Sequence, residues 1–322
     1  FLSKGFVDRA QMEARRALAQ GADSAAGNTL LGEAFMRQGV YGEALERFRD
    51  ARRDAPDHPV AMRGEARCLL NLGQGAAALP LVEKLVLQAS EDIDTLMLAA
   101  GVRAAAGDPA AALATLDTAR RVAPMRADVH REMGDIARRL GDLEGAIVNY
   151  RDALALDPQF AGVRYELAHL LIEKRQLAAA EYELLSALET VPTYAQATLE
   201  LARLRRMTGR ADSALPLLIE LLQRDPYHFD ALIALGETLL VLGRKDDAVT
   251  AFARVLRFDP HHVGALYHEG VLFAERRHFR DAIDRWEQVR TLAPATDYAR
   301  RARREIRSAT DLQRIFAERT PN

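Results

Sequence analysis

The sequence predicts an all-α protein, built as an α-solenoid of stacked helix-turn-helix repeats. Three recurring features predict it: an alanine that returns every 34 residues without an insertion, a glycine or alanine twelve residues before it, and a proline in nearly every period. The alanines are Ala44, Ala78, Ala112, Ala146, Ala180, Ala214, Ala248 and Ala282. A fixed period of this length is typical of helix pairs that stack on one another, and it argues against a single central core.

The recurring small residues mark the places where two helices cross. The earlier residue of each period lies in the first helix of a pair, at Gly32, Ala66, Ala100, Gly134, Ala168, Ala202, Gly236 and Gly270. The periodic alanine lies in the second helix. Only glycine or alanine lets two backbones approach closely without a clash, so each pair of small residues predicts one tight helix crossing.

Glycines and prolines predict where the helices end. A glycine stands between the two helices of six repeats, at Gly39, Gly73, Gly107, Gly141, Gly209 and Gly243. A turn of this kind needs a residue that tolerates positive φ, and Arg175 and Arg277 take that place in two repeats. Proline cannot continue a helix and follows the second one, at Pro56, Pro124, Pro158, Pro192, Pro226, Pro260 and Pro294. Ser90 is the exception.

The period divides most of the chain into eight full repeats, preceded by a partial repeat over 1–24. The full repeats are 25–58, 59–92, 93–126, 127–160, 161–194, 195–228, 229–262 and 263–296. The partial repeat opens partway through a first helix and lacks an initiator methionine. We therefore expect the chain to be a piece of a longer protein.

Residues 297–322 are expected to end the array. In the next period, the positions that need small residues hold Arg304 and Phe316. Residues 297–308 predict a polar capping helix that shields the last apolar face, and 309–322 predict a further short helix and a tail.

The pattern resembles the tetratricopeptide repeat, in which the alanine is followed four residues later by a large side chain and then by proline. The pairs are Ala44/Phe48, Ala78/Val82, Ala112/Leu116, Ala146/Tyr150, Ala180/Leu184, Ala214/Leu218, Ala248/Phe252 and Ala282/Trp286. Departures are local, such as the polar Asn28 and His130 at the first signature position. The resemblance implies a right-handed superhelix whose concave face is lined by the first helix of each pair.

The resemblance also implies that a protein or peptide partner binds this concave face. The candidate binding residues are Arg131, Glu132, Asp135, Arg138, Tyr165, Glu166, His169, Leu199, Glu200, Arg203, Ile233 and Tyr267. Glu132, Glu166 and Glu200 recur once per repeat as an acidic ladder. On this hypothesis charge sets the register of a bound extended or helical segment, and the apolar anchors are Tyr165, Leu199, Ile233 and Tyr267.

A simpler interpretation of the same residues stays open. Charges at helical spacing, such as Glu200 and Arg203, also pair with one another and merely solvate a helix face. Exposed pairs of this kind contribute little to stability and are common. The sequence does not choose between the two interpretations.

Composition excludes several classes of protein. The net charge of −2 and the absence of an extended basic face argue against nucleic-acid binding. No apolar run approaches ~18 residues, so no membrane span is expected, and no signal peptide is recognised; a cytoplasmic location is favoured, with a periplasmic one left open. The lone Cys68 excludes an internal disulfide and is expected to pack as a small apolar residue.

Motifs that resemble cofactor-binding or metal-binding sites are better explained as parts of the repeat. Residues 73–78, Gly-Gln-Gly-Ala-Ala-Ala, match a dinucleotide-binding pattern, but they join helix to helix rather than strand to helix. Asp92 lies at a repeat junction, where aspartate favours a helix start. His262 shares its phase with His58 and His228, so these histidines are interpreted as turn residues. The sequence predicts no catalytic residue, no metal ligand and no cofactor.

Two glycines inside first helices suggest a weak joint. Gly64 and Gly101 lie in neighbouring repeats, and a glycine in a helix interior costs ~1 kcal/mol relative to alanine. The hypothesis is a locally bendable segment near residues 60–107.

These observations predict a non-enzymatic scaffold for protein–protein interaction, part of a larger protein or assembly that the Ala/Arg-rich composition suggests is bacterial. The alternative is an accessory repeat domain of an enzyme or secretion component whose catalytic or membrane part lies outside this sequence. A third expectation is self-association through the open N-terminal end at Phe1, Val7 and Ala10.

Overall fold

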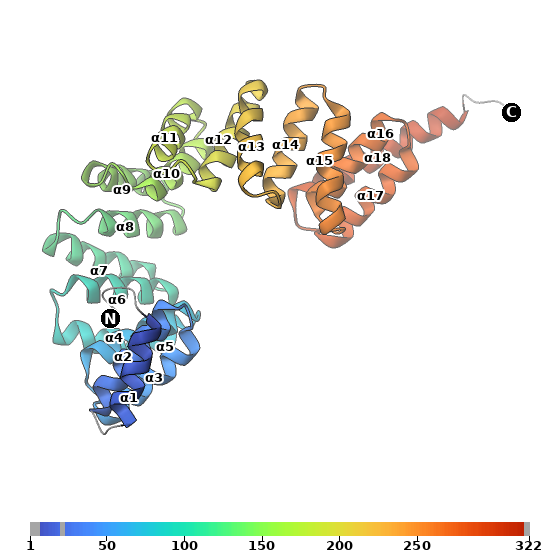
Figure 1. Ribbon diagram of the computed structural model, residues 1–322. Helices are drawn as coiled ribbons and strands as arrows, with labels where there is room; N and C mark the ends of the chain where they lie inside the picture. Colours follow the sequence, from blue (N-terminus) through green and yellow to red (C-terminus); the bar gives the residue numbers. More distant parts are fainter. Residues whose placement is uncertain (1–6, 20–22, 319–322) are drawn as a thin grey trace. The chain divides into compact units, whose positions relative to one another are not determined.

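The computed structural model describes residues 7–19 and 23–318, and every regular element within these ranges is an α-helix (Figure 1). The chain divides into two compact halves, residues 1–163 and 164–322. The N-terminal half contains α1 (Val7–Ala19), α2 (Ser24–Arg37), α3 (Tyr41–Asp54), α4 (Pro59–Asn71), α5 (Gly75–Gln88), α6 (Ile93–Ala105), α7 (Pro109–Val122), α8 (Ala127–Arg139) and α9 (Leu143–Leu156).

The C-terminal half opens with α10 (Ala161–Glu173), which begins just before the boundary. It continues with α11 (Leu177–Thr190), α12 (Ala195–Met207), α13 (Ala211–Arg224), α14 (Phe229–Val241), α15 (Lys245–Phe258), α16 (Val263–Glu275), α17 (Phe279–Leu292) and α18 (Asp297–Glu318). The predicted all-α solenoid of helix pairs is confirmed.

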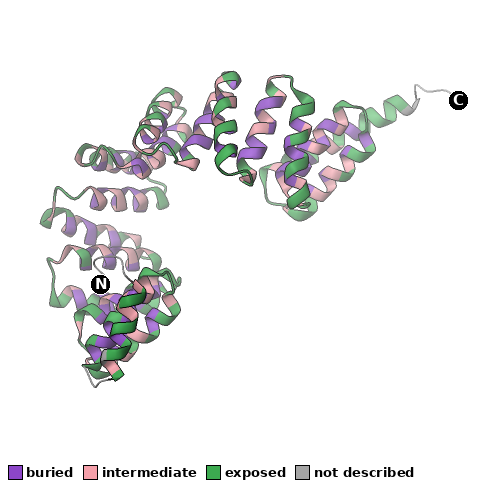
Figure 2. Cartoon of the chain, viewed as in Figure 1, coloured by how far each residue is buried: buried purple, intermediate pink, exposed green. Residues whose placement is uncertain are grey.

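The helix lengths repeat as regularly as the sequence does. From α4 to α17 each first helix has 13 residues and each second helix has 14. Buried residues occupy the sides of the helices that face neighbouring helices, in each half (Figure 2). Because each helix buries only one side, a repeat is stable only when it is stacked on the next one.

The turns inside the repeats have the backbone conformation that the glycines predict. All six turn glycines have φ between 74° and 90°. Arg175 and Arg277 take the same conformation, with φ of 60° and 62°, because the turn geometry is set by the two packed helices. These two arginines are the non-glycine residues with positive φ in the described part of the chain.

The first-helix glycines sit against aromatic rings of the second helix. A Cβ added to Gly134 would lie 2.6 Å from the ring of Tyr150, and one added to Gly32 would lie 2.8 Å from the ring of Phe48. A Cβ added to Gly64 would also meet the ring of Phe48, at 2.3 Å. Gly64 therefore has a packing role, which the hypothesis of a weak joint did not foresee.

Histidines and aspartates start several first helices. The Nδ1 atoms of His58, His228 and His262 accept hydrogen bonds from the backbone N–H three residues later, at 3.2, 3.3 and 3.3 Å. Asp92, at the same place in the period, accepts from the N–H of Thr95. The interpretation of Asp92 as a helix start is confirmed, and the histidines, which the sequence indicated as turn residues, cap their helices in the same way. Each cap satisfies a donor that has no partner within the helix.

The C-terminal helix differs from the expectation. Residues 309–318 continue α18 without a break, whereas the sequence analysis placed a second short helix there. Asp311 holds the turn position of this period, and the helix continues through it, whereas Arg175 and Arg277 at the same position form turns. Ala299, Ala302 and Ala309 are buried on the side of α18 that packs against the preceding helices.

Three further expectations concern separate features. Cys68 is fully buried in the apolar core of the N-terminal half, as expected for a small apolar residue, and burial raises the pKa of its thiol to about 11. Among the described helices, none combines the length and the apolar character needed to cross a bilayer. Phe1, one of the residues expected at a self-association surface, lies outside the described residues, while Val7 and Ala10 are half-buried on α1.

Candidate interaction surface

The predicted binding residues of the N-terminal half lie on α8, where three of them form ion pairs with one another. The Arg131 guanidinium donates to Asp135 at 2.7 Å and also pairs with Glu132. The second carboxylate oxygen of Asp135 accepts a hydrogen bond from the Tyr150 hydroxyl at 2.6 Å. Arg138 is exposed one turn further along. The charges here are held in place by one another and by α9.

The predicted residues of the C-terminal half lie on successive first helices. Tyr165, Glu166 and His169 are on α10, Leu199, Glu200 and Arg203 are on α12, Ile233 is on α14, and Tyr267 is on α16. The first helices α12 and α14 contact each other directly. Glu200 on α12 lies close enough to Tyr165 on α10 to raise its pKa, and the Glu237 carboxylate on α14 contacts His268 on α16. These side chains therefore belong to one row of adjacent helices.

Three of the four expected anchors are buried within this row. Leu199, Ile233 and Tyr267 expose only 6, 6 and 7% of their surface. They join the core of the C-terminal half and leave little apolar area for a partner. Their assignment to a binding surface remains a prediction, but Tyr165 is the anchor that keeps accessible surface.

Tyr165 lies beside a second tyrosine and two carboxylates. Its ring centroid is 5.5 Å from that of Tyr194 and 6.3 Å from that of His169. Burial raises the pKa of Tyr165, and the negative charges of Glu200 and Glu166 raise it further. The Arg203 guanidinium is 3.6 Å from the Glu200 carboxylate. The surface here is aromatic at its centre and acidic at its edge.

A charged network formed by residues outside the predicted binding set connects three first helices. The carboxylate of Glu237 on α14 accepts a hydrogen bond from Arg206 on α12 at 2.7 Å, and its other oxygen lies 2.9 Å from Nε2 of His268 on α16. The Tyr298 ring of α18 packs edge-on against His268. Arg206, Glu237 and His268 hold the same positions within their repeats as predicted residues do elsewhere, so the period was the signal that could have found them.

The network lowers the pKa of Glu237. Burial alone would raise that pKa, but the hydrogen bond with His268 and the positive charge of Arg206 outweigh burial. Burial and the Glu237 carboxylate together raise the pKa of Tyr298 to about 12. Glu237 is therefore a permanent negative charge near neutral pH, fixed between two basic side chains.

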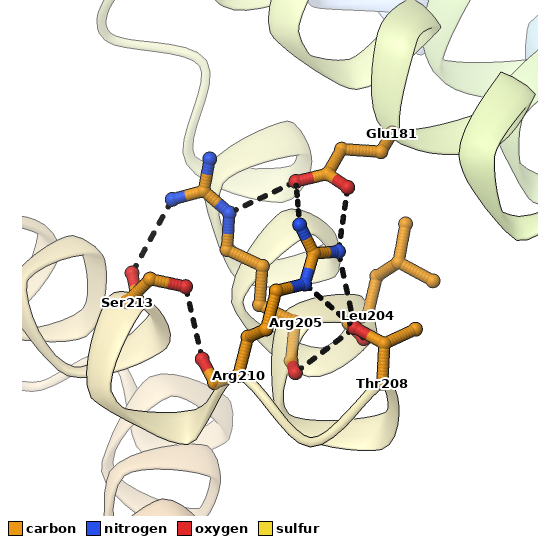
Figure 3. Close-up of polar contacts among 6 residues, drawn as sticks. All are labelled: Glu181, Leu204, Arg205, Thr208, Arg210 and Ser213. Atoms are coloured by element: carbon orange, nitrogen blue, oxygen red, sulfur yellow. Dashed lines mark hydrogen bonds and ion pairs between the residues drawn. The ribbon is translucent and has the colours of Figure 1, made fainter.

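A second ionic group joins α11 to α12 and to the turn between α12 and α13 (Figure 3). The Glu181 carboxylate accepts hydrogen bonds from Arg210 at 2.6 and 3.1 Å and from Arg205 at 3.1 Å. These hydrogen bonds with Arg210 lower the pKa of Glu181 against the opposing effect of burial, and Arg205 adds to the lowering. Arg205 also donates to the backbone carbonyl of Ser213. The group fixes the junction between two repeats.

The described residues offer no arrangement suited to metal-based chemistry. Within residues 7–19 and 23–318, no three His, Cys, Asp or Glu side chains come close enough to hold a metal ion. The glycines of the 73–78 motif serve packing and turning: Gly73 has φ of 74°, and a Cβ on Gly75 would lie 2.7 Å from that of Ala105. The residues that stand out in this structure are charged and aromatic groups on helix surfaces.

Family models identify the repeat. A model described as tetratricopeptide repeat matches residues 35–100 and 205–272, and one described as TPR repeat matches residues 134–174. Together these matches cover more than half of the 322 residues. The chain belongs to the tetratricopeptide repeat family. It is accordingly a repeat scaffold of the kind that proteins use to bind other proteins.

Solved structures share the tetratricopeptide repeat fold with this chain. PilW, described as a widely conserved type IV pilus biogenesis factor, is 20% identical with a TM-score of 0.58, covering 66% of this chain and 98% of its own. PilF of Pseudomonas aeruginosa is 18% identical with a TM-score of 0.54, covering 65% and 95%. The Cut9–Hcn1 hetero-tetramer of the APC/C is 13% identical with a TM-score of 0.58, covering 88% and 55%. At these identities the likeness concerns the fold. A comparison with curated proteins gives no significant match.

Proposed function

We propose that this chain is a non-catalytic scaffold that binds an extended or helical segment of a partner protein along α10, α12, α14 and α16. The observation that carries the proposal is the Arg206–Glu237–His268 network, which ties three successive first helices together. Since those helices are held in register, the charged side chains on them are already in place before a partner arrives. Preorganisation of this kind reduces the ordering cost of binding.

The chemistry of the surface suggests how a segment would be held. The half-buried Tyr165 and Tyr194 offer flat apolar area, and tyrosine rings are frequent centres of binding energy at interfaces. Glu166 and Glu200 lie close enough to raise the pKa of Tyr165, so they place negative charge beside the rings. A partner segment with a basic residue next to an apolar one would match this arrangement. The group formed by Arg131, Glu132, Asp135 and Arg138 offers a separate contact area on the N-terminal half.

Charge reversal tests the proposal. Partners would be captured from a native lysate on the immobilised chain and identified by mass spectrometry, and the affinity of a purified partner would then be measured. Glu166→Lys with Glu200→Lys should weaken the binding of that partner at least tenfold, while the melting temperature of the chain changes little. The matched control is Glu189→Lys with Asp212→Lys, which reverses two exposed carboxylates on the second helices α11 and α13. Equal affinity of all three proteins would contradict the proposal.

We further propose that the scaffold works inside a larger bacterial protein or assembly. The support for a bacterial origin is the Ala/Arg-rich composition. Size-exclusion chromatography of a native lysate would test this through the elution volume of the tagged protein. Elution of the protein at the mass of its own single chain would count against an assembly.

A further inference from the structure

The outer side of α18 carries a stripe of arginines. Arg300, Arg303, Arg304 and Arg307 follow one another at helical spacings i, i+3, i+4 and i+7, and Arg314 continues the line two turns later. All five side chains are exposed. Residues at these spacings share one face of a helix, so the guanidinium groups form a single basic surface.

The arginine stripe occupies the side of α18 that corresponds to a packing side in the earlier first helices. α18 stands where the first helix of a ninth repeat would stand, and it packs on α17 and α16. Arg304 is one period after Gly270, which faces Trp286 of its own second helix, and Arg307 is one period after the partly buried Phe273. The arginines therefore cover the side on which every earlier first helix receives its second helix.

Few carboxylates neutralise this stripe. Arg300 pairs with Asp297 at 3.2 Å, and Arg303 donates to the backbone carbonyl of Pro294 at 3.0 Å. Within the described residues, no carboxylate forms an ion pair with Arg303, Arg304 or Arg307. Like charges at i+3 and i+4 destabilise a helix. A helix that needed only a polar outer side would gain from mixed signs, so a stripe of one sign indicates a ligand of the opposite sign.

We propose that the arginine stripe binds the acidic face of a helix from a partner protein, lying along the side of α18 where a ninth repeat would have its second helix. Guanidinium groups form paired hydrogen bonds with carboxylates, and glutamates at i, i+3, i+4 and i+7 of a partner helix would match the arginine spacing. The proposal concerns a different surface from the first-helix row and does not rest on the function proposed above.

Two other polyanions fit the stripe less well. A nucleic acid needs an extended basic track, whereas residues 164–296 of the same half carry 19 acidic and 17 basic side chains. An anionic membrane favours a helix with apolar side chains beside its basic ones. The stripe has no apolar residue between Arg300 and Arg307 on its own face, and the exposed Leu312 and Ile315 lie only at its far end.

The experiment measures binding of defined probes to the full chain by fluorescence anisotropy. The main probe is a labelled alanine-rich helical peptide with four glutamates at i, i+3, i+4 and i+7. A second peptide has the same composition with the glutamates spread around the helix. A twenty-nucleotide oligothymidine and vesicles of phosphatidylcholine and phosphatidylglycerol are the competitors.

The variants separate the stripe from overall charge. Arg303→Gln with Arg304→Gln and Arg307→Gln should lower the affinity for the main probe at least tenfold. The melting temperature of this variant should equal or exceed that of the original chain. Arg254→Gln with Arg257→Gln removes two exposed arginines of α15 and should leave the affinity within twofold. A variant with glutamate in place of all three stripe arginines should bind a version of the main probe whose four glutamates are replaced by lysine.

Four results would overturn the proposal. They are equal binding of the two peptides, unchanged affinity of the stripe variant, an equal loss in the α15 variant, and tighter binding of the oligonucleotide or the vesicles than of the main probe.

Discussion

A Cβ added to Gly270 would lie 2.5 Å from Nε1 of Trp286, sixteen residues later in the partner helix. The same relationship recurs along the chain. Where the later residue is aromatic the earlier one is glycine, in Gly32/Phe48, Gly134/Tyr150, Gly236/Phe252 and Gly270/Trp286. Where the later residue is leucine or valine the earlier one is alanine, in Ala66/Val82, Ala100/Leu116, Ala168/Leu184 and Ala202/Leu218. The two residues of each pair together fill a nearly constant volume, because the helices cross there at a nearly constant distance.

This relationship predicts the effect of a single methyl group. In Gly236→Ala the new Cβ would meet the ring of Phe252 at 2.4 Å. Overpacking of this kind costs ~1–3 kcal/mol, and the better helix propensity of alanine offsets ~1 kcal/mol. We expect a net loss of about 1 kcal/mol in the free energy of unfolding, measured by urea denaturation followed by circular dichroism.

Two companion variants distinguish overpacking from a general effect of glycine replacement. Gly236→Ala combined with Phe252→Leu recreates the alanine–leucine pair of other repeats and should recover most of the loss. Gly101→Ala places a methyl group 3.3 Å from the movable end of Leu70 and should stabilise the chain by up to ~1 kcal/mol. A loss in Gly101→Ala equal to that in Gly236→Ala would show that the aromatic contact is not the cause.

The fold could be predicted because its determinants are local and repeat. Gly270 and Trp286 are sixteen residues apart, and their counterparts recur seven times. The continuity of α18 was harder to predict, because the lack of a glycine at Asp311 does not decide it: Arg175 and Arg277 form turns at the same position. The junction histidines such as His58 were recognised because they share one position in the repeat, although only the structure shows that they accept hydrogen bonds.

The candidate surface could be predicted only in outline. The positions that face a partner were taken from the family pattern, which does not say how closely neighbouring first helices approach one another. Contact between α12 and α14 buries Leu199 and Ile233, which were expected as anchors. The pairing of Glu237 with His268 joins residues 31 positions apart, and it depends on the same stacking distance. Periodicity therefore predicts which helices meet but not how much of each side chain stays accessible.

The turn arginines should cost stability. Arg175 holds a φ of 60°, which is unfavourable for a residue with a Cβ. Arg175→Gly should raise the free energy of unfolding by about 0.5–1 kcal/mol, after the greater flexibility of glycine in the unfolded chain is allowed for. Thermal melts followed by circular dichroism would measure it. Gly209→Ala, at an equivalent turn with φ of 77°, should change stability in the opposite direction, and a gain there would contradict the argument.

The Glu181 group should respond differently to single and double replacement. The position of Glu181 is apolar in every other full repeat, at Leu45, Leu79, Leu113, Ile147, Leu215, Val249 and Ile283. Glu181→Leu alone leaves Arg205 without its carboxylate and should lower the free energy of unfolding by about 1 kcal/mol. Glu181→Leu with Arg205→Leu recreates the apolar contact and should match or exceed the original stability, as urea denaturation would show. A double variant less stable than the single one would mean that the ion pair outweighs apolar packing at this junction.

The Glu237 network predicts how stability depends on pH. Its folded pKa lies below the ordinary value of 4.5, so the folded state binds the proton less readily than the unfolded chain does. The stabilising contribution of the Glu237 charge is therefore complete above about pH 4.5 and is lost as the pH falls through the folded pKa. We expect the melting temperature of the original chain to exceed that of Glu237→Gln most at neutral pH, and the difference to shrink below pH 4.5. Glu189→Gln, on an exposed carboxylate of α11, is the control and should show a small difference at every pH. A difference between the original chain and Glu237→Gln that stayed constant from pH 7 to pH 3 would mean that the carboxylate charge contributes nothing to the network.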